Sequence, residues 1–190
     1  MTTKREETGT LLSCRSAIRV LDATLRDGGL VNEFRFSDPF VRALFAANAA
    51  AGVDYMELGY KSDADIFDRE KFGKWKFCRE DDVFAVLGEN KTDMKLSCMA
   101  DVGRCNFARD ICDRGSSPFD MYRIATYINT IPAAVEMIEY CEKKGYETTV
   151  NIMAVSRETE KELSIALEML GKSPVRAIYI VDSYGSVYPE

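Results

Sequence analysis

The fold is decided by the stretch Leu21-Asp22-Ala23-Thr24-Leu25-Arg26-Asp27-Gly28-Gly29, which follows a short apolar run over residues 18–21. Apolar runs that end in charged residues and glycines are typical of a buried strand that delivers side chains to its C-terminal end. Arg26 and Asp27 carry opposite charges, and such residues are rarely buried unless they are paired. Two interpretations stand on spacing alone. The stretch is either an ordinary surface turn, or a site where Asp27 holds a divalent cation and Arg26 holds an anionic oxygen.

The composition is that of a globular chain with an acidic balance. Of its 190 residues, 46% are hydrophobic and 29% are charged, and the formal net charge is −6. We expect no nucleic-acid partner, because the chain has no concentrated basic tract to bind a phosphate backbone. We also expect no membrane partner, since no run approaches the roughly 20 apolar residues that span a bilayer. Residues 1–16 lack the apolar centre of a signal peptide, so a cytoplasmic location is expected.

Six cysteines and the complete lack of histidine narrow the chemistry further. The cysteines are scattered without a C-x-x-C pair, so we expect reduced, mostly packed thiols rather than disulfides or a zinc cluster. Histidine is the commonest general base and metal ligand, and neither role can be filled by it in this chain.

Strands and helices alternate along the rest of the sequence. Strands are expected over residues 18–25, 53–58, 94–100, 121–127, 147–155 and 176–181. The expected helices are one capped by Ser37 and ended by Gly52, a short one over 81–88, one opened by Thr130-Ile131-Pro132, and one capped by Ser156. This alternation requires parallel strands joined by helical crossovers. We interpret the aromatic-rich segment 61–79 as a loop that folds over one mouth of the sheet, anchored by its aromatic side chains.

Two closures fit this alternation, a (β/α) barrel and an open doubly wound sheet. No G-x-G-x-x-G follows the first strand, which disfavours a dinucleotide-binding sheet. Polar residues end several strands, which favours a barrel because one mouth collects them. These residues are Arg26, Asp27, Glu57, Asp101, Asp182 and Ser183. The expected fold class is therefore α/β, a TIM-type (β/α) barrel represented by its first six βα units, and an open sheet is the alternative. We expect residues 1–17 to be an N-terminal extension and residues 18–190 to be a partial barrel domain that lacks strands seven and eight.

Three motifs resemble, in chain order, those of the DRE-TIM metallolyases. Asp22-Ala23-Thr24-Leu25-Arg26-Asp27-Gly28 resembles the strand-one signature of that family. Met56-Glu57-Leu58-Gly59 is similar to its strand-two glutamate and glycine, and Val181-Asp182-Ser183-Tyr184-Gly185 to its strand-six end. The family includes hydroxymethylglutaryl-CoA lyase, isopropylmalate and homocitrate synthases, the carboxyltransferase domain of pyruvate carboxylase, and 4-hydroxy-2-oxovalerate aldolase. The resemblance covers roughly residues 18–190 and looks closest to the aldolase-like branch.

The resemblance implies a carbon–carbon bond lyase or aldolase that acts on small 2-oxo acids, and more narrowly on 4-hydroxy-2-oxo acids. Its cofactor would be Mn²⁺ or Mg²⁺, and Asp27 would be a carboxylate ligand of that hard cation. Arg26 would stabilise the enolate oxygen, and Glu57 would pair with Arg26 and fix it. Ser183 would lie near the substrate carboxylate. From the residues alone, Glu57 is also consistent with a structural ion pair, and Ser183 with a polar cap on the strand-six loop.

Two departures from the family pattern leave a second function class open. The family binds its metal with an H-x-H pair on strand seven, which we expect this chain not to reach, and Asp27 alone cannot hold a catalytic metal tightly. The histidine acid/base of the bacterial aldolases falls at Leu30, so the proton transfer has no assigned residue, and Asn32 cannot act as a base. The alternative is a truncated or degenerate, non-catalytic barrel that binds a small anion or a partner chain. Its open edges, at strands one and six, would favour pairing with another chain, and a homo-oligomer is one form of that pairing.

Overall fold

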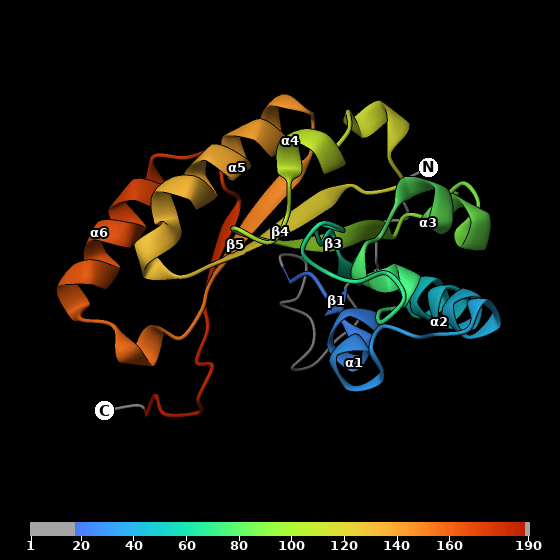
Figure 1. The fold of residues 1–190 in the computed structure, drawn as a ribbon, viewed down its shortest axis with the longest axis horizontal. Coiled ribbons are helices and arrows are strands. Elements are labelled where there is room, and N and C mark those ends of the chain that lie inside the picture. Colours follow the sequence, from blue (N-terminus) through green and yellow to red (C-terminus); the bar gives the residue numbers. More distant parts are fainter. Residues whose placement is uncertain (1–17, 189–190) are drawn as a thin grey trace, which may run out of the picture.

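The computed structural model describes residues 18–188, in which six strands form one sheet bordered by helices (Figure 1). The strands are β1 Leu21–Asp22, β2 Tyr55–Tyr60, β3 Lys95–Asp101, β4 Met121–Thr126, β5 Glu147–Ile152 and β6 Ala177–Ile180. The α-helices are α1 Thr24–Asn32, α2 Asp38–Ala51, α3 Glu80–Leu87, α4 Phe107–Asp110, α5 Ile131–Lys143 and α6 Glu160–Gly171. Short 3₁₀ turns cover Lys74–Lys76, Arg114–Ser116, Ile128–Thr130 and Val155–Arg157.

The strands are all parallel and their order in the sheet is their order in the sequence, from β1 to β6. Figure 1 shows the sheet curled, with α6, α5, α4, α3 and α2 following one another around its outer side. This is a half-barrel rather than a flat open sheet. The predicted TIM-type architecture is confirmed for its six βα units. The predicted N-terminal extension, residues 1–17, lies outside the described residues.

Local capping explains where the long helices begin and end. At α2, Ser37 Oγ accepts a hydrogen bond from the Phe40 N–H at 3.4 Å, and Pro39 occupies the first turn. Gly52 ends the helix in the left-handed region at φ 72°, which glycine adopts without strain. These are the signals on which the prediction for this helix rests, and it is confirmed.

The first strand is much shorter than predicted, because the chain turns at Asp22. The Asp22 carboxylate accepts hydrogen bonds from the Thr24 N–H at 3.2 Å and the Thr24 hydroxyl at 2.7 Å. Side chains of this kind commonly compete with the sheet ladder for backbone donors. The motif that was assigned to a strand end therefore lies in helix α1. Its glycines serve packing: a Cβ on Gly29 would sit 2.1 Å from the Phe34 ring.

The helix after β5 also begins later than predicted. Residues Val155–Arg157 form a 3₁₀ turn, and α6 is capped by Thr159 instead of Ser156. Thr159 Oγ1 accepts from the Glu162 N–H at 3.3 Å, and the Glu162 carboxylate accepts from the Thr159 N–H at 3.0 Å. This reciprocal capping box satisfies two donors of the first turn, which a cap at Ser156 could not do with the residues that follow it.

The two faces of the sheet differ in character. Its outer face is apolar, and β-strand side chains such as Met56, Leu96 and Ile124 are fully or almost fully buried in a core shared with α5 and α6. Strand register places a polar set on the opposite, inner face, because residues paired across parallel strands point the same way. Its members are Tyr55, Glu57, Ser97, Arg123, Thr149 and Asn151. The inner face is therefore the wall on which a site can be built.

The segment 61–79 is anchored by aromatic side chains, as predicted. Trp75 is fully buried and Phe77 is 7% exposed. The turn that carries them approaches β2 so closely that a Cβ on Gly59 would lie 1.9 Å from the Trp75 carbonyl oxygen.

Further observations concern the cysteines and the helix lengths. Five cysteines in the described part of the chain are free thiols, and Cys14 lies outside it. Among the helices of residues 18–188, none is long and apolar enough to cross a membrane.

Candidate active site at the inner face of the half-barrel

Glu57 on β2 stands between two arginines. Its Oε2 accepts hydrogen bonds from Arg26 Nε and Arg123 Nη1, each at 2.8 Å. The Glu57 side chain is fully buried, and those of Arg26 and Arg123 are 16% and 8% exposed. Arg123 reaches on to Asn151 Oδ1 at 3.4 Å, and its guanidinium lies 4.9 Å from the ring centroid of Tyr179. Four strands and helix α1 thus contribute to one polar cluster.

Arg26 projects from the first turn of α1 and is the member of this cluster that contacts Asp27. Its Nη1 donates to Asp27 Oδ1, and the Asp27 side chain is 61% exposed. Burial favours loss of the guanidinium charge, but Glu57 outweighs it and the pKa of Arg26 is raised. The arginine is a permanent cation with one side fixed by a buried carboxylate. Such a fixed cation can stabilise negative charge that develops on a substrate oxygen.

Tyr60 and Asp101, at the ends of β2 and β3, extend the cluster. Burial raises the pKa of Tyr60 to about 12, with the charge of Asp101 acting in the same direction and that of Arg26 opposing it. Burial also raises the pKa of Asp101, against the opposing charges of Lys76, Arg104 and Arg26. The strand-end position of Asp101 was part of the sequence argument, whereas Tyr60 was not singled out.

Several buried polar atoms of the inner face have no hydrogen-bond partner among the described residues. They are Glu57 Oε1, Ser97 Oγ, Asp101 Oδ1, Arg123 Nε and Thr149 Oγ1. Buried polar atoms are nearly always satisfied, and a cluster of exceptions indicates a place where water or a ligand binds. Tyr122 Oη and Thr148 Oγ1, on the outer face, also lack a hydrogen-bond partner among the described residues, so such atoms occur on both faces of the sheet.

Ser183 has a local backbone partner in the structure. It follows β6, at the opposite edge of the sheet from β1, and its Oγ accepts a hydrogen bond from the Ala154 N–H at 2.9 Å. The hydroxyl thus ties the end of β6 to the turn after β5. Its substrate-binding role stays a prediction.

The described residues do not complete a metal site. Among residues 18–188 there is no group of three or more His, Cys, Asp or Glu side chains placed to hold a metal ion. Asp27 can offer one carboxylate oxygen, while Glu57 is engaged by two guanidinium groups. The described residues thus supply one protein ligand. Mg²⁺ and Ca²⁺ are surrounded by six or more oxygen atoms, some of them from water, so one ligand does not make a site.

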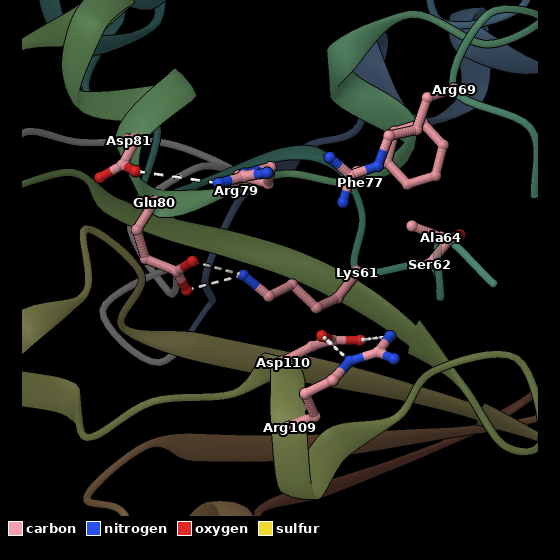
Figure 2. Close-up of a pocket in the computed structure, with 10 residues that line it drawn as sticks. All are labelled: Lys61, Ser62, Ala64, Arg69, Phe77, Arg79, Glu80, Asp81, Arg109 and Asp110. Atoms are coloured by element: carbon pink, nitrogen blue, oxygen red, sulfur yellow. Dashed lines mark hydrogen bonds and ion pairs between the residues drawn. The ribbon is translucent and has the colours of Figure 1, made fainter.

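A cavity of about 330 Å³ lies between segment 61–79, the start of α3 and helix α4. Figure 2 shows its charged lining to be largely paired within itself, Lys61 with Glu80 and Arg109 with Asp110. None of Arg26, Asp27, Glu57 or Ser183 lines it. We assign these ion pairs to holding the loop in place.

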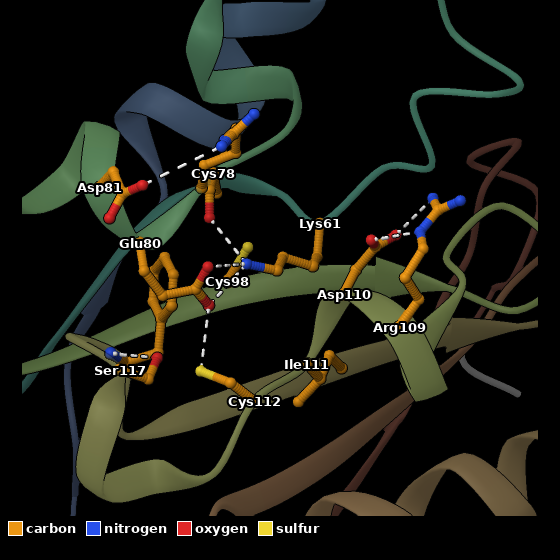
Figure 3. A network of polar contacts seen from close by, with 12 residues as sticks. Lys61, Cys78, Glu80, Asp81, Cys98, Arg109, Asp110, Ile111, Cys112 and Ser117 are labelled. Carbon is orange, nitrogen blue, oxygen red and sulfur yellow. Dashed lines mark hydrogen bonds and ion pairs between the residues drawn. The ribbon is translucent and has the colours of Figure 1, made fainter.

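Lys61 also connects the start of segment 61–79 to the chain at Cys78 and Glu80. Lys61 Nζ donates to the Cys78 carbonyl at 3.1 Å and to both oxygens of Glu80 at 2.7 and 2.8 Å (Figure 3). Cys112 Sγ approaches Glu80 Oε1 at 3.8 Å from the segment after β3. Lys61 is 3% exposed, so its ion pair with Glu80 is shielded from water. Its bond to the Cys78 carbonyl holds the chain just after the 3₁₀ turn Lys74–Lys76.

Sequence reasoning found the Arg26–Glu57 pair but missed Arg123 and Asn151. The signal was available. Each is a charged or amide residue in the middle of an otherwise apolar or β-branched run, at 121–126 and 147–152. Such a residue in a strand that is buried on both faces requires a partner inside the protein.

Comparison with known proteins finds curated relatives over most of this chain. The chain is 25% identical to 4-hydroxy-2-oxovalerate aldolase 6 of Rhodococcus jostii (strain RHA1), over 91% of its own length and 48% of the relative's. The chain is related to the 4-hydroxy-2-oxovalerate aldolases. It is also 24% identical to the oxaloacetate decarboxylase of Mycobacterium tuberculosis (strain ATCC 25618 / H37Rv), over 90% of this chain and 49% of that one. The resemblance that the three motifs indicate is thereby confirmed.

A solved structure supports the fold. The crystal structure of "the N-terminal domain of a putative aldolase" from Bacteroides vulgatus superposes with a TM-score of 0.62 at 20% identity, covering 84% of this chain and 62% of that one. No family model matches the sequence. The chain spans about half the length of the curated relatives it matches.

Proposed function

We propose that this chain carries the enolate-stabilising half of a carbon–carbon bond lyase that acts on 2-oxo acids, in particular 4-hydroxy-2-oxo acids. Relatives named as aldolases and as a decarboxylase support this assignment, since both kinds of name describe cleavage of a carbon–carbon bond. The observation that carries the proposal is the Arg26 guanidinium, whose Nε is held at 2.8 Å by the fully buried Glu57.

The chemistry follows from where charge develops. When the C3–C4 bond of a 4-hydroxy-2-oxo acid breaks, the electron pair moves toward the C2 carbonyl oxygen and an enolate forms. A cation held in place beforehand stabilises that oxygen without reorganising during the step, and removing one such donor typically costs about 10²–10³ in rate. Glu57 fixes the plane of the Arg26 guanidinium, and Arg123 holds Glu57 in turn.

We further propose that Asp27 is one ligand of a Mn²⁺ or Mg²⁺ cofactor. Its half-exposed carboxylate has the hard oxygen donors that these cations prefer. The remaining ligands would come from outside residues 18–188, and the metal would supply Lewis-acid polarisation of the substrate. Titration calorimetry with Mn²⁺ tests this directly. Binding that is lost in Asp27→Asn supports the ligand role, whereas binding that the variant retains, or a wild type that binds no Mn²⁺, contradicts it.

The experiment for the reaction is a pyruvate-release assay on a panel of 4-hydroxy-2-oxo acids with Mn²⁺ present. We expect Arg26→Ala to lower release at least 100-fold. Arg19→Ala is the matched control, because the Arg19 side chain is 64% exposed and its ion pair with Asp54 is long at 3.4 Å. Equal release by wild type and Arg26→Ala would rule out the role assigned to the guanidinium.

A non-catalytic half-barrel that binds a small anion or a partner chain is the second candidate. The observation in its favour is the exposed apolar surface at the edge strand β6, where Tyr179 and Ile180 are 40% and 52% exposed. An unpaired edge strand is a template for another chain. Under this candidate, wild type releases no pyruvate from any member of the panel.

A further inference from the structure

Lys76 is a buried cation that the proposed reaction has not yet used. It ends the 3₁₀ turn Lys74–Lys76 and is 7% exposed. Its Nζ lies 4.2 Å from the ring centroid of Phe67, 4.5 Å from that of Tyr60 and 5.1 Å from that of Phe34. Within residues 18–188 this ammonium makes no hydrogen bond and no ion pair. A lysine packed against aromatic rings with no carboxylate partner in contact is unusual, so we treat the residue as a functional candidate.

The same cage belongs to the mouth that holds Arg26. Tyr60, whose ring contacts Lys76, is the last residue of β2, three positions after Glu57. Asp101, at the end of β3, has a buried Oδ1 without a hydrogen-bond partner in the described chain, and its charge interacts with those of both Lys76 and Arg26. The lysine, the aspartate and the enolate-stabilising arginine thus form one electrostatically connected group.

Burial and neighbouring charges act on the pKa values of this group. Burial lowers the pKa of Lys76, with the charge of Asp101 opposing this and that of Arg104 adding to it. The charged or ionisable groups that act on one another here are Lys76, Asp101, Arg104, Tyr60, Arg26 and Glu57. Tyr60, with a pKa of about 12, stays neutral at physiological pH. A lowered pKa makes the neutral amine, which is the form that acts as a base, easier to reach.

We propose that Lys76 is the proton carrier of the carbon–carbon bond step, and that Asp101, at the end of β3, acts on it through its charge without direct contact. The inference rests on the proposed lyase function and fills its missing step, since the chain contains no histidine. The neutral amine takes the proton of the C4 hydroxyl, and the O–H electron pair becomes the second bond of the departing aldehyde. The C3–C4 pair becomes the enolate. The resulting ammonium then returns the proton to C3, which gives the methyl group of pyruvate and restores the amine.

The turn that carries Lys76 is held firmly enough for such a role. The backbone carbonyl of Lys76 accepts a hydrogen bond from the Ser62 N–H at 3.2 Å, and the Lys76 N–H donates to the Gly73 carbonyl at 3.0 Å. The Lys61–Glu80 ion pair fixes the chain two residues later, at Cys78 (Figure 3). A catalytic group must be held in this way by its surroundings to be effective.

The test compares three variants of the 190-residue chain in two assays, pyruvate release and exchange of deuterium from D₂O into the methyl group of pyruvate. Lys76→Met keeps an unbranched side chain in the aromatic cage, and Lys76→Arg keeps the charge but cannot lose its proton. We expect both to lower exchange and release by about 10²–10⁴, the range for removal of a general acid or base. Lys74→Met is the matched control from the same turn, because Lys74 is 31% exposed and pairs with Asp38 at 2.6 Å. It should stay within about threefold of wild type, as expected for a surface substitution, and circular dichroism should show all variants folded.

The positioning role of Asp101 has its own readout. Because its charge raises the pKa of Lys76, Asp101→Asn should move the acidic limb of the pH–rate profile for exchange to lower pH. An unshifted limb would remove Asp101 from the mechanism.

Each remaining outcome separates the two proposals. An active wild type with an equally active Lys76→Met overturns the proton-carrier role and leaves the lyase function standing, and so does an active Lys76→Arg. Borohydride trapping of pyruvate on Lys76 would also overturn it, since the residue would then be a nucleophile. A wild type that neither releases pyruvate nor exchanges its methyl protons overturns both proposals together.

Discussion

Replacing Glu57 by glutamine should lower the free energy of unfolding more than a substitution on the surface. The substitution keeps the shape of the side chain but removes the charge that two guanidinium groups share at 2.8 Å, inside a site where the carboxylate is fully buried. Two hydrogen bonds to a charged group contribute about 1.5–3 kcal/mol each. Breaking a buried ion pair by removing one partner costs about 3–5 kcal/mol, because it leaves uncompensated charge. We therefore expect Glu57→Gln to lower the free energy of unfolding by about 3–5 kcal/mol.

Urea denaturation followed by tryptophan fluorescence measures this directly. Trp75 is the single tryptophan of the chain and is fully buried, so its emission reports on loss of the core. With a denaturant slope of about 2 kcal/mol per molar urea, the unfolding midpoint should fall by about 2 M.

Glu70→Gln is the matched control for that measurement. It makes the same chemical change on an exposed residue of the loop, and it should alter the free energy of unfolding by less than about 0.5 kcal/mol. If the midpoint of Glu57→Gln falls no further than that of the control, the two arginines do not depend on Glu57 for compensation. The reasoning that makes Glu57 the anchor of Arg26 would then be refuted.

Other substitutions test the packing, the turn after β6 and the acid limb of stability. Gly59→Ala should lower the unfolding free energy by about 1–3 kcal/mol in thermal denaturation, because the added Cβ would lie 1.9 Å from the Trp75 carbonyl oxygen; an unchanged melting temperature would contradict that close approach. Ser183→Ala should cost about 1 kcal/mol by removing the acceptor of the Ala154 N–H, and an unaltered urea midpoint would show that this bond adds nothing. Burial alone would raise the pKa of Glu147, but its hydrogen bonds lower it below the usual value. The stability that Glu147 contributes is therefore full above the ordinary glutamate pKa and is lost as the pH falls below it. In Glu147→Gln the urea midpoint should depend less on pH between about pH 5 and pH 3 than in wild type. An equal dependence on pH in the two proteins would contradict this.

Local signals in the sequence predicted most elements of the fold. Ser37, Pro39 and Gly52 specify α2 through short-range capping and backbone preference, which a sequence displays directly. The alternation of apolar runs with helical patterns predicted the parallel sheet for the same reason. The predicted positions of the ends of strands and helices were less accurate. Asp22 ends β1 by bonding to Thr24, and the choice between that bond and the sheet ladder depends on energies that no pattern shows.

The candidate site was only half predictable. Arg26 and Glu57 were paired through the motifs that contain them, and the structure brings them together. Arg123 lies 66 residues beyond Glu57 in the sequence, and its hydrogen bond to Glu57 depends on the register of β3 and β4. The cage around Lys76 draws its rings from three separate parts of the chain. Contacts of this range are fixed by tertiary packing, and local sequence carries no direct record of them.

Because each strand pairs with the one before it in sequence, the half-barrel can be built in the order in which the ribosome releases it. Synthesis delivers about 5–20 residues per second, and N-terminal parts generally fold first. The β1–β2–β3 portion can form while later strands are still in the exit tunnel, with Glu57 facing Arg26 alone. Only when β4 docks does the second guanidinium arrive, so the Arg26–Glu57–Arg123 cluster is completed by one strand-pairing event.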